Sequence, residues 1–223
     1  VATMSAEQEI ALAEGAMPEL IQQYGGEVSS NQVKAYVNKV GQRLLANVES
    51  DYADLPWEFT VLNSDVINAF ALPAGKVFIT TGLLRECTNE AQVAGVLGHE
   101  IGHVTAEHVD ERITKATGLQ VLVAGVGLVS NSEMITIGAN LVSNGYQLQF
   151  GRSQESESDV LGVRYMSAAG YDPYGMMEVL FILQRASEGN RQPEFLSTHP
   201  HPETRMETVQ GLLEGDYKDT QGN

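Results

Sequence analysis

The sequence predicts an α+β fold that is mostly helical and contains one small antiparallel sheet, within a single domain over residues 1–223. Three observations predict this fold. Apolar residues recur at helical spacing before residue 50 and again after Gly82. Between residues 57 and 81 apolar and polar residues alternate, as they do in strands. No internal repeat or linker divides the chain, whose length is typical of one domain.

Two amphipathic helices are expected in the first fifty residues. The first follows Ser5, which can cap it together with Gln8, and it ends at Gly25–Gly26. The second covers the stretch SSNQVKAYVNKVGQRLLANV, whose apolar residues fall on one face. These residues are Val33, Tyr36, Val37, Val40, Leu44 and Leu45.

Three strands are expected next, over Trp57–Leu62, Val66–Leu72 and Lys76–Thr80. The link Pro73–Gly75 predicts a tight turn between the second and third strands, because proline and glycine both favour turns. This is the only β region that the pattern supports.

The remainder of the chain is expected to be helical, with active-site helices over residues 88–170 and C-terminal helices and a loop over residues 173–213. The expected segments are a long helix capped by Thr88 or Asn89, a loose helical stretch from Thr114 to Phe150, a helix from Ser153 to Gly170, a helix from Pro173 to Gly189, the loop RQPEFLSTHPHPETR, and a helix from Glu203 to Leu213.

Composition excludes several classes of function. The chain carries 13 Lys and Arg against 29 Asp and Glu, a net charge of -16, which repels phosphate and argues against nucleic acid as a partner. The most apolar run, Leu119–Val129, is far shorter than the roughly 20 residues of a membrane span. A shallow membrane contact is the alternative. The single cysteine, Cys87, cannot form an internal disulfide and is expected to be a small buried residue.

The stretch HEIGH, His99 to His103, carries the clearest chemical signal. Histidines at i and i+4 project side by side from a helix and can hold one Zn²⁺. Glu100 then lies near the metal as the general base that takes a proton from a zinc-bound water. The alternative is a pair of satisfied core histidines. His108 lies about 140° further round the helix, so it is expected at the surface.

The third ligand must come from elsewhere in the chain. A metzincin would place glycine at Ala106 and histidine at Val109, so that pattern fails here. Glu155 and Asp159 are also spaced i and i+4 on a later helix. One of them can bind the metal while the other accepts the N–H of a ligating histidine. The alternative is an exposed acidic helix start.

Together these residues resemble the HtpX-like and CAAX-prenyl-endopeptidase family of gluzincin zinc metallopeptidases. HEIGH matches the HExxH of that family, and ESESD (Glu155 to Asp159) matches its ExxxD, with Ser158 where alanine is usual. The segment NAFALPAGKVFITTGLL resembles the stretch before the active-site helix. STHPHPETR resembles the C-terminal HPxxxxR element, with His199 and Arg205 at the matching positions. The resemblance is greatest to soluble bacterial members, BepA-like or LoiP-like, since hydrophobic spans are missing.

The resemblance implies one Zn²⁺ held by His99, His103 and Glu155, with Glu100 as general base and acid. It also implies that Asp159 supports a ligand from behind. His199 and Arg205 are implied near the site, where His199 would cap the metal or donate to the oxyanion. Arg205 would hold a carboxylate or the substrate carbonyl. The alternatives are that His199 only caps turns of its loop, or that His201 takes its role.

The implied function is that of a zinc endopeptidase acting on polypeptides, in protein quality control of the bacterial cell envelope. Because the chain starts at Val1, we expect an export signal or anchor to have been removed, which favours a periplasmic or membrane-anchored protein over a cytoplasmic one. The strand after Pro73–Gly75 is expected to bind substrate as an edge strand, unless it is paired on both sides. Alternatives are a zinc-holding chaperone or adaptor with little proteolysis, and a structural zinc domain, although such domains are usually rich in cysteine. The sequence sets no oligomeric state.

Overall fold

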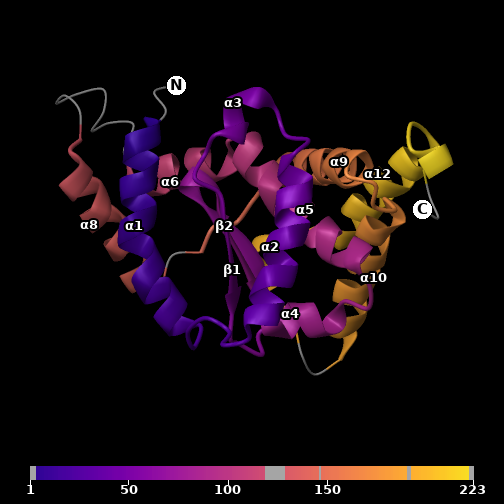
Figure 1. Ribbon diagram of the computed structural model, residues 1–223, viewed down its shortest axis with the longest axis horizontal. Coiled ribbons are helices and arrows are strands. Elements are labelled where there is room, and N and C mark those ends of the chain that lie inside the picture. Colours follow the sequence, from indigo (N-terminus) through magenta and orange to yellow (C-terminus); the bar gives the residue numbers. More distant parts are fainter. Residues whose placement is uncertain (1–3, 119–128, 146, 190–191, 221–223) are drawn as a thin grey trace.

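The computed structural model describes residues 4–118, 129–145, 147–189 and 192–220. Part of the stretch expected to be loosely helical, and all of the apolar run Leu119–Val129 except Val129, fall outside this set. Over the described residues the fold is α+β and mostly helical, as predicted (Figure 1). None of the described helices is both long enough and apolar enough to cross a membrane.

The elements follow the sequence pattern with few shifts. Their bounds are α1 Ala6–Gln23, α2 Asn31–Leu45, α3 Ser50–Ala53, β1 Glu58–Leu62, β2 Ala69–Leu72, a 3₁₀ turn Pro73–Gly75, β3 Lys76–Thr80, α4 Thr81–Glu86, α5 Glu90–Thr105, α6 His108–Thr117, α8 Asn131–Ser143, α9 Arg152–Ala168, α10 Tyr174–Glu188, α11 Phe195–Thr198, α12 Pro202–Glu214 and a 3₁₀ turn Lys218–Thr220.

Two of the expected helix starts are confirmed by their caps. The Ser5 hydroxyl accepts from the Gln8 N–H, and the Gln8 side chain accepts from the Ser5 N–H, which forms a capping box. Asn89, rather than Thr88, caps α5 by accepting the Gln92 N–H at 2.9 Å. The helix expected to have Ser153 as its cap begins two residues earlier, with Gly151 as the cap and Arg152 as the first residue of α9.

The sheet has three strands in the order β1–β3–β2, and it is mixed rather than antiparallel. β2 pairs with β3 antiparallel across the predicted turn, but β1 pairs with β3 in parallel. The chain after β1 passes the end of β3, where the Thr80 hydroxyl binds the carbonyls of Val66 and Asn68 and holds this link in place. β3 is therefore central, and the expectation that it is the substrate-binding edge strand is wrong. β2 is the edge on that side.

The helices form two groups around the sheet. α1 packs along α8 on one side of the molecule, and α5, α9, α10 and α12 pack together on the other (Figure 1). α5 is the central helix, with every residue from Gln92 to Thr105 buried. Its apolar side chains belong to the main core, whose burial supplies most of the driving force for folding.

The crossing of α5 and α9 is close because glycines line it. A Cβ on Gly98 would lie 3.2 Å from the Gly162 carbonyl oxygen, and one on Gly102 would lie 3.0 Å from that of Ser158. Gly98 and Gly102 are one turn apart on α5, beside the two histidines of HEIGH. The absence of side chains there lets α9 approach near enough to bring its carboxylates to those histidines.

The long helix expected through HEIGH stops earlier than its sequence indicates. α5 ends at Thr105, and Glu107 has the left-handed φ of 61°, which few residues other than glycine adopt. A new helix, α6, starts at His108. This break changes the position of His108, as the site shows.

Candidate metal centre

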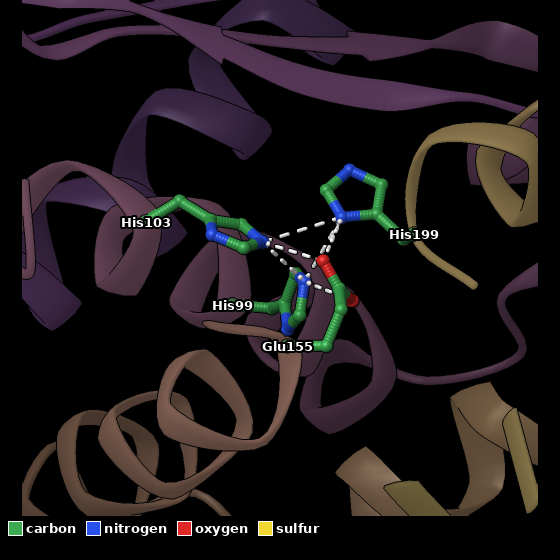
Figure 2. Close-up of side chains that lie close together, drawn as sticks. All are labelled: His99, His103, Glu155 and His199. Atoms are coloured by element: carbon green, nitrogen blue, oxygen red, sulfur yellow. Dashed lines mark hydrogen bonds and ion pairs between the residues drawn. The ribbon is translucent and has the colours of Figure 1, made fainter. Parts of the chain in front are cut away.

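Four buried side chains from α5, α9 and the loop after α11 converge on one point (Figure 2). His99 Nε2 and His103 Nε2 are 3.0 Å apart. His199 Nδ1 lies 3.2 Å from the first and 3.3 Å from the second. Glu155 Oε1 lies 3.0 Å from His103 Nε2 and 2.9 Å from His199 Nδ1, and its Oε2 is 3.3 Å from His99 Nε2. We call these four residues the donor set.

The dimensions of the donor set suit a metal ion. Ligand atoms around a tetrahedral zinc with bonds of about 2.0–2.1 Å lie about 3.3 Å from one another. The six closest separations in the donor set, two of them to Glu155 Oε1 and one to Glu155 Oε2, are 2.9–3.3 Å and so close to that value. The structure therefore provides three nitrogens and one carboxylate that could hold a metal ion.

The charge balance of the site also suits a cation. Glu100, Glu155 and Asp159 are fully buried and face one buried guanidinium, that of Arg205. Buried carboxylates are costly unless they are paired or bind a metal. Both oxygens of Glu100, Glu155 Oε2 and His199 Nε2 are buried without a hydrogen-bond partner. With all three carboxyl groups ionised, this group carries more negative than positive charge, which a divalent cation would compensate.

Two members of the donor set have pKa values that suit a metal site, whereas Glu155 and Asp159 raise the pKa of His99 to about 9 against the effects of burial and Arg205. Burial raises the pKa of Glu155, but His199, Arg205 and His99 outweigh it and hold that pKa well below its usual range. Burial holds the pKa of His103 well below its usual range. Glu155 is thus ionised and His103 neutral, the forms in which these groups bind metals.

His199 is placed by a loop that is hydrogen-bonded at two points. The Phe195 N–H donates to the Ile67 carbonyl at 3.1 Å, and the Phe150 N–H donates to the Thr198 carbonyl at 3.2 Å. The Phe195 ring stacks on the His199 ring with centroids 4.1 Å apart. His201, the alternative candidate, lies outside the donor set, at the start of α12 with a left-handed φ of 65°.

His99 is supported from behind by a buried ion pair. Its Nδ1 lies 2.7 Å from Asp159 Oδ1. Arg205 donates to the same carboxylate from Nε at 2.7 Å and from Nη2 at 2.9 Å. It also contacts Glu155, with Nη1 3.3 Å from Oε2. Of the two roles left open for Arg205, its contacts are those of a residue that holds carboxylates.

His103 is supported by a residue that the sequence placed wrongly. His108 is not at the surface but buried, and its Nδ1 lies 3.0 Å from His103 Nδ1. The expectation assumed one continuous helix, and the left-handed Glu107 turns His108 back toward His103. No glycine, asparagine or proline marks this break, so the sequence offered no signal for it.

Glu100 faces the donor set from the far side of His199. Its Oε1 lies 3.2 Å from His199 Nε2, at an angle that does not make a hydrogen bond. Burial raises the pKa of the Glu100 carboxyl. A carboxyl in this position can exchange a proton with a group that enters the site.

A cleft of about 320 Å³ opens beside His199. It lies between the edge strand β2, the C-terminal ends of α1 and α8, and the segment that leads into α9. Its walls are mostly apolar and include Leu20, Phe70, Leu72, Leu141, Leu148 and Phe150. One end is polar, since Asn68 donates to the Tyr24 hydroxyl, which donates to Glu194. The cleft therefore reaches one member of the donor set, His199.

The fold and the site together define a class of protein. A buried helix that carries HExxH, a second helix that adds a carboxylate, and a small sheet beside them are the architecture of an HExxH metallopeptidase. The chain belongs to peptidase family M48, whose sequence pattern matches residues 31–213, and it is thus a hydrolase. The family resemblance seen in HEIGH and ESESD is confirmed.

Among the relatives of this chain are proteins named as metalloendopeptidases or proteases. It is 34% identical over 208 residues to the mitochondrial metalloendopeptidase OMA1 of Schizosaccharomyces pombe, covering 91% of this chain and 60% of that protein. It is 33% identical over 181 residues to the beta-barrel assembly-enhancing protease of Yersinia pestis, covering 77% of this chain and 37% of that protein. The chain thus spans at most three fifths of the length of these two relatives.

Proposed function

We propose that this chain is a zinc endopeptidase that hydrolyses peptide bonds in polypeptides, with residues 1–223 as one metallopeptidase domain. His99, His103 and Glu155 hold the zinc, and Asp159 supports His99. The observation that carries the proposal is the convergence of the donor set, whose members approach one another at 2.9–3.3 Å through three ring nitrogens and the two oxygens of Glu155, in a buried site with three carboxyl groups. Zinc, when bound, lowers the pKa of a water and polarises the substrate carbonyl.

Glu100 is the residue that moves the proton. Its oxygens are buried without a hydrogen-bond partner, so they are free to accept one from the attacking water. The raised pKa of the carboxyl suits it to pass that proton to the leaving amine. Arg205 keeps Asp159 and Glu155 ionised and in place, which fixes the ring of His99 and the carboxylate that holds the metal.

His199 closes the site in the resting protein. Its Nδ1 faces the other three members of the donor set, and its Nε2 faces Glu100. The His199 ring therefore lies between Glu100 and those three residues. The entry of substrate must therefore displace His199, after which its imidazole can donate to the developing oxyanion. Two backbone hydrogen bonds tie the loop that carries it to the segments before β2 and α9, at Ile67 and Phe150, and the Arg205 side chain donates to the His199 carbonyl at 3.5 Å.

The cleft beside β2 favours extended polypeptide as the substrate. Asn68 pairs with Thr80 of β3, so by alternation the main chain of Ala71, which lines the cleft, faces away from β3, whereas the N–H of Ala69 already donates to Asn68 Oδ1 at 2.9 Å. An extended peptide can add to such an edge through main-chain hydrogen bonds. The apolar walls of the cleft then favour apolar side chains, which unfolded proteins expose.

The place of action proposed is the bacterial cell envelope, in the periplasm or at the membrane through a segment outside this chain, in protein quality control. The relatives named beta-barrel assembly-enhancing protease support this proposal. Misfolded envelope proteins are the proposed substrates. Incubation of the chain with unfolded outer-membrane protein, followed by identification of the cleavage sites, tests the substrate.

A second candidate is a zinc-holding chaperone or adaptor with little proteolysis, which the closed position of His199 favours. Digestion of casein with and without a zinc chelator separates the two. The endopeptidase predicts cleavage that the chelator abolishes and added Zn²⁺ restores. Binding of unfolded casein without cleavage, at every zinc concentration, supports the second candidate instead.

A further inference from the structure

The two histidines of HEIGH have different supports. Behind His99 lies the fully buried pair of Asp159 and Arg205. Behind His103, a chain of hydrogen bonds leads to solvent: His103 Nδ1 lies 3.0 Å from His108 Nδ1, and His108 Nε2 lies 3.0 Å from Glu157 Oε2. The His108 side chain is 4% exposed and that of Glu157 is 59% exposed.

When His103 binds a metal, only one arrangement of donors and acceptors fits this series of hydrogen bonds. A histidine that binds a metal through Nε2 carries its proton on Nδ1. The His103 Nδ1–H then needs an acceptor, and the atom facing it is His108 Nδ1. That nitrogen accepts only if the proton of His108 is on Nε2, where it donates to Glu157. The carboxylate of Glu157, which only accepts, therefore selects the tautomer of both rings.

The surrounding structure keeps His108 in this role. The left-handed Glu107, a conformation of raised energy, is what turns His108 toward His103. Ser158 Oγ lies 3.4 Å from His108 Nδ1 and can donate to the same lone pair. Phe150 stacks on the His103 ring with centroids 3.8 Å apart, which fixes the plane of that ring.

We infer that His108, held by Glu157, is a positioning residue that fixes His103 in the Nδ1–H tautomer and so directs its Nε2 lone pair at the metal. This inference rests on the proposed zinc site. Removal of such outer partners of a metal ligand typically weakens metal binding about 10–100-fold.

The exchange of Glu157 for lysine tests the inference without disturbing the core. A lysine side chain only donates hydrogen bonds, so in Glu157→Lys it favours His108 with an unprotonated, accepting Nε2. The ring proton of His108 is then on Nδ1, where it faces the Nδ1–H of His103. The matched control is Glu111→Lys, since Glu111 is exposed on α6, makes the same charge change and also bonds across to α9, through Gln154. The Zn²⁺ dissociation constant is measured for each protein by competition with a chromophoric chelator.

We expect the dissociation constant of Glu157→Lys to rise about 10–100-fold. That of Glu111→Lys should stay within about threefold of wild type, because an exposed charge is largely screened by salt and Glu111 is not part of the His103–His108–Glu157 series. His108→Phe, which keeps a ring but loses the acceptor, should match Glu157→Lys. If His108→Phe does not fold, Glu157→Lys decides alone. Equal affinity of Glu157→Lys and Glu111→Lys overturns the inference.

Nitrogen-15 spectra of the histidine rings give a second readout that a packing role would not move. In the zinc-loaded wild type, His108 should carry its proton on Nε2 and His103 on Nδ1. A His108 proton on Nδ1 overturns the inference even if the affinities change. A wild-type protein that binds no Zn²⁺ would instead contradict the proposed function, so the two failures are distinct.

Discussion

Arg205 donates two parallel hydrogen bonds to Asp159, from Nε to Oδ2 at 2.7 Å and from Nη2 to Oδ1 at 2.9 Å, and both residues are almost fully buried. Asp159 Oδ1 is in turn 2.7 Å from His99 Nδ1. The guanidinium is therefore behind His99, on the side away from the center of the donor set. It acts on the chemistry through the residues that it holds, and the fold depends on it as well.

Loss of this pair should be costly. Arg205→Met leaves Asp159 and Glu155 buried without their cation, and breaking a buried pair typically costs about 3–5 kcal/mol of unfolding free energy. Arg85→Met is the control, because its exposed pair with Asp65 should be worth about 0–1 kcal/mol. Urea unfolding of both variants measures the difference. A loss below about 1 kcal/mol for Arg205→Met contradicts the role given to the pair.

Removal of the Glu155 carboxylate should release the metal. Glu155 is the one member of the donor set that supplies a negative charge, and Glu155→Ala leaves Arg205 still paired with Asp159. We expect elemental analysis to show zinc loss in Glu155→Ala and in His103→Ala. Glu203→Ala, an exposed carboxylate on α12, should keep its zinc. Full zinc and full activity in Glu155→Ala would mean that the metal has another ligand.

Exchange of Glu100 for glutamine should separate metal binding from turnover. Glu100 lies outside the donor set, so Glu100→Gln is expected to retain its zinc. The amide cannot accept a proton from water, and general base catalysis contributes typically ~10²–10⁴-fold. We expect turnover of an unfolded polypeptide to fall by that factor, with unchanged thermal unfolding. A variant that keeps more than about a third of the wild-type rate removes Glu100 from this role.

The sequence predicted the parts of the site that depend on local spacing. His99 and His103, and likewise Glu155 and Asp159, are one helical turn apart, so a helix places each pair on one face without help from the rest of the fold. The meeting of the two pairs could be expected only from the resemblance. In the structure it depends on Gly98 and Gly102, whose missing side chains let α9 approach.

The predictions from the sequence were wrong where the position of a residue or strand depends on a single backbone angle or on a long-range pairing. The φ of 61° at Glu107 has no glycine or asparagine to announce it, and it moves His108 from the surface to the site. The parallel pairing of β1 with β3 joins strands that are not neighbours in the chain, which alternation of residues cannot predict. Both errors arise from tertiary contacts that override local pattern.

Stability should fall with rising pH because of a carboxyl pair between α1 and α6. Burial raises the pKa of Asp110, and the adjacent Glu9 carboxyl raises it further, to about 9. In the unfolded chain this group loses its proton near about pH 4, so the stability due to the neutral form is lost as pH rises from about 4 to about 9. Asp110→Asn removes this loss, which for one group is at most about 1.4 kcal/mol per pH unit.

We therefore expect the melting temperature of Asp110→Asn, relative to wild type, to increase steadily between pH 5 and pH 9. Asp51→Asn, an exposed carboxylate on α3, should show no such trend. Calorimetry of the three proteins at four or five pH values measures the difference. A difference that is constant with pH would show that Asp110 does not stay protonated in the folded protein.

The last prediction concerns His199, for which the two roles give opposite results. As the ligand that completes the donor set, with its ring in front of Glu100, it excludes the catalytic water, so His199→Ala should raise hydrolysis of a short peptide several-fold. As an oxyanion donor alone, its loss should lower kcat by about 10²–10³. We expect the rise, because in the resting structure Nδ1 is within 3.3 Å of all three other members of the donor set. Three ligands remain, so zinc should be retained.

His201→Ala, in the same loop but outside the donor set, is the control and should behave as wild type. A short fluorogenic peptide is the right substrate, because it can enter the cleft without help from another protein that would displace the His199 loop. A fall in kcat with zinc intact would assign His199 to the transition state only, and an unchanged rate would remove both roles.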